Sequence, residues 1–259
     1  MRVISVINLK GGVAKTTTST NMAYILAEKH NKKVLVIDND KQGNISKSFQ
    51  RYDPEDIYTT ASIMTQKECT DKIIKKTAYE NIDIIPANMG LIDANMRVMF
   101  DQARPQQTRF EKAFARLKLE AAYDYCIIDN APDINISIIN ALVVTDDVIV
   151  PIVIDQYSFD GLSILAEQIE QIRENFNENI RLAGCLITQY QRNDVNEQGN
   201  DILNQKMPYP VFKQTIRRTD RFVQESTFAH IPVVEYSVRC GCSQDYKKFV
   251  AEYLKNTEE

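Results

Sequence analysis

Short apolar runs rich in Val and Ile alternate along this chain with segments whose apolar residues have helical spacing. The runs are RVISVIN, KVLVID, IDIIP, YDYCIID, DVIVPIV and LAGCLIT. Helices are expected at about Thr16 to Lys29, Arg109 to Leu119, Ile136 to Leu142, Gly161 to Asn175 and Gln244 to Lys255. Continuous apolar strands need cover on both faces, so the pattern predicts an α/β fold with a mostly parallel sheet between two layers of helices.

The length and composition suit one large domain. The chain has 259 residues, of which 44% are apolar and 25% charged, and it shows no internal repeat, low-complexity tract or long linker. Residues 1–259 are therefore expected to form a single domain. In folds of this class ligands bind at the carboxyl ends of the strands, so functional motifs are expected just after them.

Membrane insertion and export are not expected. No window reaches about 18 consecutive apolar residues, and no charged leader precedes a long apolar stretch. The five cysteines lack the paired spacings of a zinc site and the density of a secreted disulfide scaffold. They are interpreted as reduced thiols of a cytoplasmic protein, and the stretch RCGC (239–242) as free thiols in a turn rather than a metal or redox site.

The first apolar run leads through LKGGVAK into TTTSTNMAYILAEK, an order of strand, glycine-rich turn and helix that is typical of a phosphate-binding loop. Gly11 and Gly12 allow backbone N–H groups to point inward, Lys15 supplies positive charge, and the helix dipole begins at Thr16. The hydroxyl of Thr16 is expected on Mg²⁺, and Thr17 is placed to reach another phosphate. The standard phosphate-loop motif G-x-x-x-x-G-K-[ST] requires glycine at positions 9 and 14, where this chain has leucine and alanine. An ordinary glycine turn before a helix is the alternative interpretation.

Carboxylates follow two further runs. Asp38 ends one run and Asp40 follows it at a two-residue interval that keeps both side chains on one side of an extended chain, while Asp129 ends another run. Each one alone could be a turn residue at a strand end. Together, downstream of a phosphate loop, they indicate a Mg²⁺–ATP site.

The string KGGVAKTT resembles the deviant phosphate loop K-G-G-x-x-K-[ST] of the ParA/MinD group of ATPases. The resemblance implies a P-loop NTPase-like fold, with ATP and Mg²⁺ as cofactors, and it implies that Lys10 reaches across a dimer interface to the nucleotide of the other subunit. The nucleotide-binding residues that it implies are Lys10, Gly11, Gly12, Val13, Ala14, Lys15, Thr16 and Thr17. Leu9 fits the deviant pattern, but the group usually has glycine where this chain has Ala14. Because the Cβ of alanine disfavours positive φ, Ala14 is expected at negative φ. Nucleotide affinity is the property that alanine at this position is expected to affect.

The resemblance also assigns roles to the carboxylates. The stretch DNDKQGN is similar to the group's D-x-D-P-Q-G-N switch, with Lys41 in place of proline, which implies that Asp40 positions the attacking water. Asp129 resembles the Walker B aspartate, and Thr16, Asp38 and Asp129 are the expected magnesium residues. In-line hydrolysis of ATP is then expected, with Lys10 and Lys15 stabilising charge.

Family-like segments continue through Ile84–Met96, Asp155–Leu165 and Val211–Ser237. Residues 206–221 within and before the last segment carry a charge of +4, although the whole chain carries −4. Such a segment suits salt-dependent contacts to DNA phosphates without base readout. The expected DNA-binding residues are Lys213, Arg217, Arg218 and Arg221, with Arg221 first. A solvated basic loop is the alternative.

The resemblance predicts a ParA/Soj-type partition ATPase. Such a protein dimerises on ATP, binds DNA nonspecifically, and hydrolyses ATP when a ParB-like centromere-binding partner stimulates it, which implies a cytoplasmic, nucleoid-associated protein without a membrane partner. The main alternative is a MinD-like membrane-associated regulator of cell division, or an ATPase that positions a protein cargo. The acidic ending LKNTEE disfavours binding to an anionic membrane. A bacterial tyrosine kinase would carry a tyrosine-rich tail, and an iron–sulfur reductase would carry bridging cysteines.

Overall fold

The structure is a computed structural model that describes residues 1–155 and 158–258. Gln156 and Tyr157 of the family-like segment Asp155–Leu165 lie outside the described residues, as does Glu259 of the acidic ending.

The described residues form a seven-stranded sheet in the order β3-β4-β2-β5-β1-β6-β7. Its strands are β1 (Arg2–Val6), β2 (Val34–Asn39), β3 (Lys75–Lys76), β4 (Ile82–Ile85), β5 (Tyr125–Asn130), β6 (Asp147–Ile152) and β7 (Arg181–Ile187). Every neighbouring pair is parallel except β3 with β4. The six predicted strands and the mostly parallel sheet are confirmed. The edge strand β3 was not predicted, because two lysines carry no apolar signal, and charge is a common feature of exposed edges.

The helices are α1 (Lys15–His30), α2 (Asn44–Ser48), α3 (Thr60–Thr65), α4 (Gly90–Met99), α5 (Arg109–Leu117), α6 (Leu119–Ala122), α7 (Ile136–Val143), α8 (Ser158–Asn175), α9 (Asp194–Lys206), α10 (Asp220–Phe228), α11 (Val233–Tyr236) and α12 (Gly241–Glu258). The five predicted helices are present, but the one expected to run from Arg109 to Leu119 is interrupted. Lys118 adopts φ 52° and separates α5 from α6. α12 begins at Gly241, so RCGC ends in a helix start rather than lying wholly in a turn.

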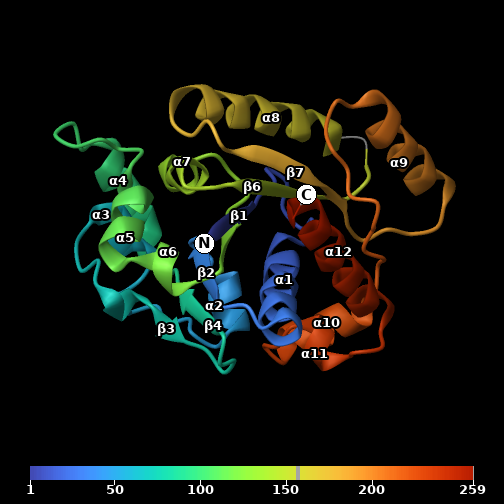
Figure 1. The fold of residues 1–259 in the computed structure, drawn as a ribbon, viewed down its shortest axis with the longest axis horizontal. Coiled ribbons are helices and arrows are strands. Elements are labelled where there is room, and N and C mark those ends of the chain that lie inside the picture. Colours follow the sequence, from blue (N-terminus) through green and yellow to red (C-terminus); the bar gives the residue numbers. More distant parts are fainter. Residues whose placement is uncertain (156–157, 259) are drawn as a thin grey trace.

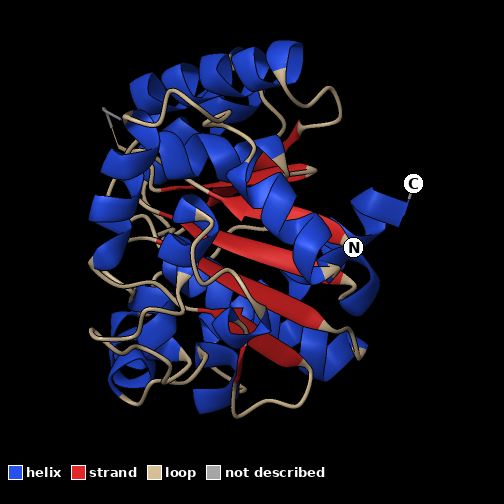
Figure 2. Cartoon of the chain, turned by 90° about the vertical axis from the view of Figure 1, so that its left-hand side faces the viewer, coloured by secondary structure: helices blue, strands red, loops and turns tan. Residues whose placement is uncertain are grey.

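The strands have two buried faces, as their continuous apolar sequences require. In β2, Val34 and Val36 pack into a core with Met22 and Leu26 of α1 and with residues of α12. Their neighbours Leu35 and Ile37 face the opposite core, which α3, α4, α5 and α7 complete. A third cluster joins β6 and β7 to α8 and α9. Figure 1 shows α1 and α12 on one face of the sheet and α7 and α8 on the other, and Figure 2 shows the strands between helices.

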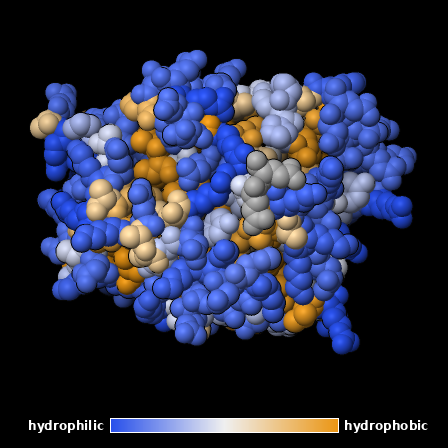
Figure 3. Space-filling model, in the orientation of Figure 1, coloured by the Kyte–Doolittle hydropathy of each residue, from blue (hydrophilic) through white to orange (hydrophobic). Residues whose placement is uncertain are grey.

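The face shown in Figure 3 is mainly hydrophilic and carries several separate apolar patches. No helix among the described residues is long and apolar enough to cross a membrane.

Candidate functional site

The carboxyl ends of three central strands bring the predicted residues together. In the parallel register Asp129 of β5 is paired with Val6 of β1 on one side and with Asp38 of β2 on the other. The loop after β1 therefore lies beside both carboxylates. This placement follows from the strand order, since β1, β5 and β2 are adjacent in the sheet.

The loop between β1 and α1 uses two left-handed residues. Gly12 has φ 74°, and a Cβ built there would meet nothing within 4 Å. Ala14, the N-cap of α1, has φ 65° and ψ 30°, and its carbonyl accepts the first helical bond from Thr18 N at 2.9 Å. The expectation of a negative φ for Ala14 was wrong, because the entry into α1 imposes a left-handed residue directly before Lys15. The alanine therefore bears the strain that a glycine would avoid.

Lys15 is buried in the loop. Its Nζ donates to the carbonyl oxygens of Asn8 at 3.0 Å and Lys10 at 2.9 Å. Burial lowers the pKa of Lys15, against the opposing attraction of Asp129 and other nearby carboxylates. Val13 does not project into the site, because its side chain is buried and its carbonyl accepts a bond from Thr188.

Asn8 is a loop-supporting residue that the sequence analysis missed. It is buried, its Nδ2 donates to Pro151 O at 2.8 Å, and its Oδ1 accepts from Lys10 N at 2.9 Å. Together with its carbonyl bond to Lys15, these contacts connect both loop lysines to the end of β6. Only its position at the carboxyl end of a strand could have indicated this role.

Asp129 lies under the start of α1. Its Oδ2 accepts from Thr16 Oγ1 at 2.7 Å and its Oδ1 from Ser19 Oγ at 2.8 Å. Burial raises the pKa of Asp129 to about 6, although both hydroxyl bonds act to lower it. A carboxylate and a hydroxyl at this spacing match the oxygen ligands that Mg²⁺ takes, directly or through water, beside a bound phosphate.

Asp38 is fully buried and supports the adjoining turn. Its Oδ2 accepts from the Oγ and N of Ser46 at 2.5 and 3.0 Å, and its Oδ1 accepts from Asp40 N at 3.1 Å. Burial, with the nearby charge of Asp129, raises the pKa of Asp38 to about 8. Its oxygens are thus occupied by the protein, and its expected role at magnesium stays a prediction.

Asp40 lies at the edge of a cleft in a turn that glycine makes possible. Asp40 O accepts from Gly43 N at 2.9 Å, and Asp40 Oδ1 accepts from Gln42 N at 2.9 Å. Gly43 has φ 65°, and a Cβ there would lie 2.4 Å from the ring of Tyr52. The turn therefore requires glycine, and it holds Asp40 and Lys41 at the cleft wall.

The cleft has a volume of about 490 Å³ and collects most of the predicted nucleotide residues. Among the described residues, its lining includes Gly11, Gly12, Ala14, Lys15, Thr16, Thr17 and Asp40. Backbone N–H groups at a helix start, a buried lysine and two hydroxyls form a donor set that fits polyphosphate. Six of the eight residues predicted for nucleotide binding thus lie around one cleft, and their role there stays a prediction.

Lys10 does not line that cleft. Its Nζ forms an ion pair with Asp155, three residues beyond β6, and both side chains are 38% exposed. Within the described part of the chain, the two lysines of the loop therefore point to different places, Lys15 into the cleft and Lys10 out of it.

A second, more apolar pocket of about 300 Å³ adjoins the first and shares Gly12, Ala14 and Thr17 with it. Its other lining residues are Thr188, Gln189, Ile216, Arg217, Arg218, Thr219, Asp220, Val223, Gln224, Cys242 and Tyr246. Gln189 Nε2 donates to Gly12 O at 2.6 Å. This pocket suits the base and sugar of a nucleotide whose phosphates occupy the cleft. No sequence motif indicated this pocket, although Gln189 lies just after β7.

The basic segment is divided between this pocket and the surface. Arg217 and Arg218 line the pocket, and Arg217 makes a two-pronged ion pair with Asp245, at 2.7 Å (Nε) and 2.8 Å (Nη2). Arg221 lies on α10 with a side chain that is 80% exposed and paired with Glu225 at 2.9 Å, and Lys213 is exposed. The side chain of Arg221 is more exposed than those of Arg217 and Arg218, which are 56% and 47% exposed.

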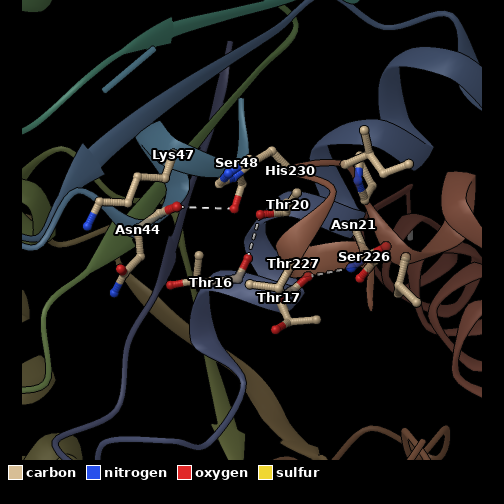
Figure 4. Close-up of a pocket in the computed structure, with 13 residues that line it drawn as sticks. Thr16, Thr17, Thr20, Asn21, Asn44, Lys47, Ser48, Ser226, Thr227 and His230 are labelled. Atoms are coloured by element: carbon tan, nitrogen blue, oxygen red, sulfur yellow. Dashed lines mark hydrogen bonds between the residues drawn. The ribbon is translucent and has the colours of Figure 1, made fainter. Parts of the chain in front are cut away.

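A polar groove of about 270 Å³ continues from Thr16 and Thr17 between α2 and α10 (Figure 4). Several of its side chains bond to their own helices: Thr20 to Thr16 O, Asn21 to Thr17 O and Ser48 to Asn44 O. Those groups are therefore not directed at a ligand.

All five cysteines are buried and free. Among the described residues, no group of three His, Cys, Asp or Glu side chains could hold a metal ion.

Comparisons with known proteins agree with this geometry. Residues 1–182 match the sequence model of a family described as AAA domain. The chromosome partitioning protein ParA of Caulobacter vibrioides is 28% identical over 260 residues, which cover 100% of this chain and 96% of that protein. The sporulation initiation inhibitor protein Soj of Bacillus subtilis is 29% identical over 256 residues, or 98% of this chain and 99% of that protein. The structure of cobyrinic acid a,c-diamide synthase from Mycobacterium smegmatis with bound ADP and magnesium is 25% identical, with a TM-score of 0.84 and coverage of 100% of this chain and 96% of that one.

Proposed function

The chain belongs to the AAA domain family and is a P-loop ATPase of the ParA/MinD type, and from this premise we propose that it is a partition ATPase. It assembles on ATP into a dimer, binds DNA nonspecifically, and hydrolyses ATP when a ParB-like partner stimulates it. The proposed place of action is the nucleoid, in the cytoplasm.

The observation that supports dimer formation is that the side chains of the two loop lysines point to different places. Lys15 lines its own cleft, while Lys10 is turned out of it toward Asp155. A second cationic side chain in a phosphate loop that does not serve its own cleft is positioned to serve the nucleotide of another molecule. This geometry supports the trans role that the sequence resemblance implies for Lys10.

The residues of the cleft have different roles in the proposed hydrolysis of ATP. Lys15 and the N–H groups of the loop bind the phosphates, and Asp40 orients the attacking water at the cleft wall. Thr16 and Asp129 would hold Mg²⁺, which would neutralise phosphate charge when bound. Lys10 of a second chain adds positive charge where the transferred phosphoryl group develops negative charge.

DNA binding is proposed at the exposed part of the basic segment. Arg221 presents a cationic group to solvent on α10, and Lys213 is exposed beside α12, where its N donates to Glu252. Phosphate contacts of this kind carry no sequence preference. The local charge of +4 in a chain of net −4 favours such binding at this segment.

Gel filtration of an Asp40→Ala variant with ATP and Mg²⁺ tests the dimer. Loss of the water-orienting carboxylate is expected to block hydrolysis, so that the ATP-bound dimer accumulates, whereas ADP leaves the chain monomeric. If hydrolysis is blocked and no dimer forms, the dimer mechanism is rejected.

Co-sedimentation separates the proposal from the membrane-associated alternative. The ATP-bound protein is expected to sediment with DNA and not with anionic liposomes. Retention on liposomes alone would reject the partition function and favour a MinD-like one.

A further inference from the structure

We infer that Lys41 binds the terminal phosphate of ATP within its own chain. The inference rests on the proposed function, because it takes the cleft as the phosphate site. It adds Lys41 to the two lysines of the phosphate loop and makes it the residue that distinguishes ATP from ADP.

Lys41 and Lys15 line the same cleft from different strands. Lys15 follows β1 and Lys41 follows β2, and β5 lies between those two strands in the sheet. Lys41 is half-buried, and its ammonium group makes no hydrogen bond or ion pair with any group that the structure describes. A cation in this position is available to an anionic ligand in the cleft.

The position of Lys41 selects the last phosphate of the nucleotide. Asp40, Lys41 and Gln42 line the cleft but not the adjoining pocket that suits the base and sugar. They therefore lie at the end of the site away from the base, where a triphosphate has its terminal phosphate. Asp40, which is proposed to orient the attacking water, is the direct neighbour of Lys41 in the chain.

The charges around the cleft give Lys41 a purpose there. Asp40 and Asp133 line the cleft as anions, and Lys15 and Lys41 line it as cations. Without Lys41, one cation would face two anions, and this balance would oppose the binding of a polyphosphate. With Lys41 the charges of the lining side chains balance.

The turn that carries Lys41 does not depend on the N–H of this residue. Gly43 N donates to Asp40 O at 2.9 Å, so Lys41 is the second residue of a four-residue turn, which is a position that proline favours. Lys47 Nζ donates to Gln42 O at 2.7 Å and braces the turn from α2. The φ of Lys41 is negative, and its N–H donates to no described group. Lys41→Pro is therefore expected to keep the turn and to remove the ammonium group.

Lys41→Met tests the inference, because it removes the charge and keeps most of the length of the side chain. The measurement is isothermal titration calorimetry with Mg²⁺ in a Lys10→Ala background, which removes the contribution of a second chain. Binding of a non-hydrolysable ATP analogue is expected to weaken about tenfold, as for the loss of a hydrogen bond to a charged group. Binding of ADP, whose phosphates lie farther from Lys41, is expected to weaken by less than about twofold.

Three further variants separate the charge from the turn. Lys41→Pro is expected to match Lys41→Met, and Lys41→Arg is expected to retain most of the affinity for the analogue. Lys112→Met is the matched control, since Lys112 is an exposed lysine of α5 that does not line the cleft, and it is expected to change neither affinity.

Protection from chemical labelling tests the contact without altering Lys41. In Lys10→Ala, an amine-reactive reagent followed by peptide mass spectrometry is expected to modify Lys41 more slowly with the ATP analogue than with ADP. Lys112 is expected to react at the same rate with both. A merely structural role of Lys41 in the turn would not protect its amine in response to one nucleotide and not the other.

Lys15→Ala separates this inference from the proposed function. If Lys15→Ala abolishes binding, then an equal change in the affinities for the analogue and ADP in Lys41→Met overturns the inference and leaves the cleft as the phosphate site. Equal labelling of Lys41 with both nucleotides overturns it too. If Lys15→Ala binds both nucleotides as its parent does, the cleft is not the phosphate site, and the proposed roles of its residues fail together with the inference.

Discussion

Ala14 occupies a left-handed conformation that costs an alanine about 1–2 kcal/mol relative to the right-handed one. Glycine pays little of that cost, but it gives the unfolded chain more freedom, worth about 0.4–1 kcal/mol in the opposite direction. The strain is the larger of the two. Ala14→Gly is therefore expected to raise the free energy of unfolding by about 0.5–1 kcal/mol, measured by urea denaturation without nucleotide.

Ala251→Gly is the matched control, since Ala251 is an exposed residue inside α12 with ordinary helical geometry. There the same change is expected to lower the free energy of unfolding by about 1 kcal/mol. Equal losses at both positions would show that Ala14 is unstrained.

The residues of the site could be predicted where a local motif specifies them. Lys15, Thr16, Asp40 and Asp129 all meet at the carboxyl edge of the sheet, since each follows a strand or begins a helix. The conformation of Ala14 could not be predicted, because residue type favours negative φ and the entry into α1 overrides it. The roles of Asn8 and Gln189 depend on bonds to distant backbone, which no local pattern encodes.

Asp147 begins β6 and joins three other elements at the amino edge of the sheet. Its buried carboxylate accepts from Arg2 of β1 and Arg181 of β7, and from Tyr253 of α12 at 2.6 Å. Burial acts to raise the pKa of Asp147, but the bonds from Arg2, Arg181 and Tyr253 outweigh it and hold the pKa below its ordinary range. The ionised form is therefore stabilised by folding.

Asp147→Asn is expected to lower the free energy of unfolding at pH 7 by about 2 kcal/mol, less than for a fully buried pair because both arginines are partly exposed. A lowered pKa gives stability that is complete above the ordinary value of about 4 and is lost as pH falls through the folded value. Denaturant melts from pH 7 to pH 2 are thus expected to show the wild-type advantage shrinking below about pH 4.

Asp93→Asn removes the exposed pair with Arg97 on α4 and is expected to change stability by less than about 0.5 kcal/mol at any pH. A wild-type advantage over Asp147→Asn that grows toward acid pH would contradict the assignment.

At the scale of elements, the strands were predictable because burial on both faces makes them continuously apolar. The break between α5 and α6 could not be predicted, since lysine is compatible with a helix and yet Lys118 adopts a left-handed conformation. The short edge strand β3 depends on pairing with β4 rather than on its own residues.

For the molecule as a whole, charge placement predicts how DNA binding responds to salt. Arg221→Ala removes one exposed cation and is expected to reduce the slope of log affinity against log salt concentration by about 1, equally on unrelated DNA sequences. Glu225→Gln frees Arg221 from its carboxylate partner and is expected to strengthen binding. Fluorescence anisotropy of the ATP-bound protein across a salt series measures both.

Arg97→Ala, a comparable loss of an exposed arginine on α4, is the control and is expected to leave the slope unchanged. Equal slopes for the wild type and Arg221→Ala would remove α10 from the DNA surface.

The sheet order has a consequence for the newly made chain. β1 is synthesised first but lies between β5 and β6, which begin at Tyr125 and Asp147. At roughly 5–20 residues per second, the backbone N–H and C=O groups along both edges of β1 stay without their strand partners for on the order of ten seconds. A ribosome-associated chaperone is therefore expected to cover the first strand for longer than any later strand.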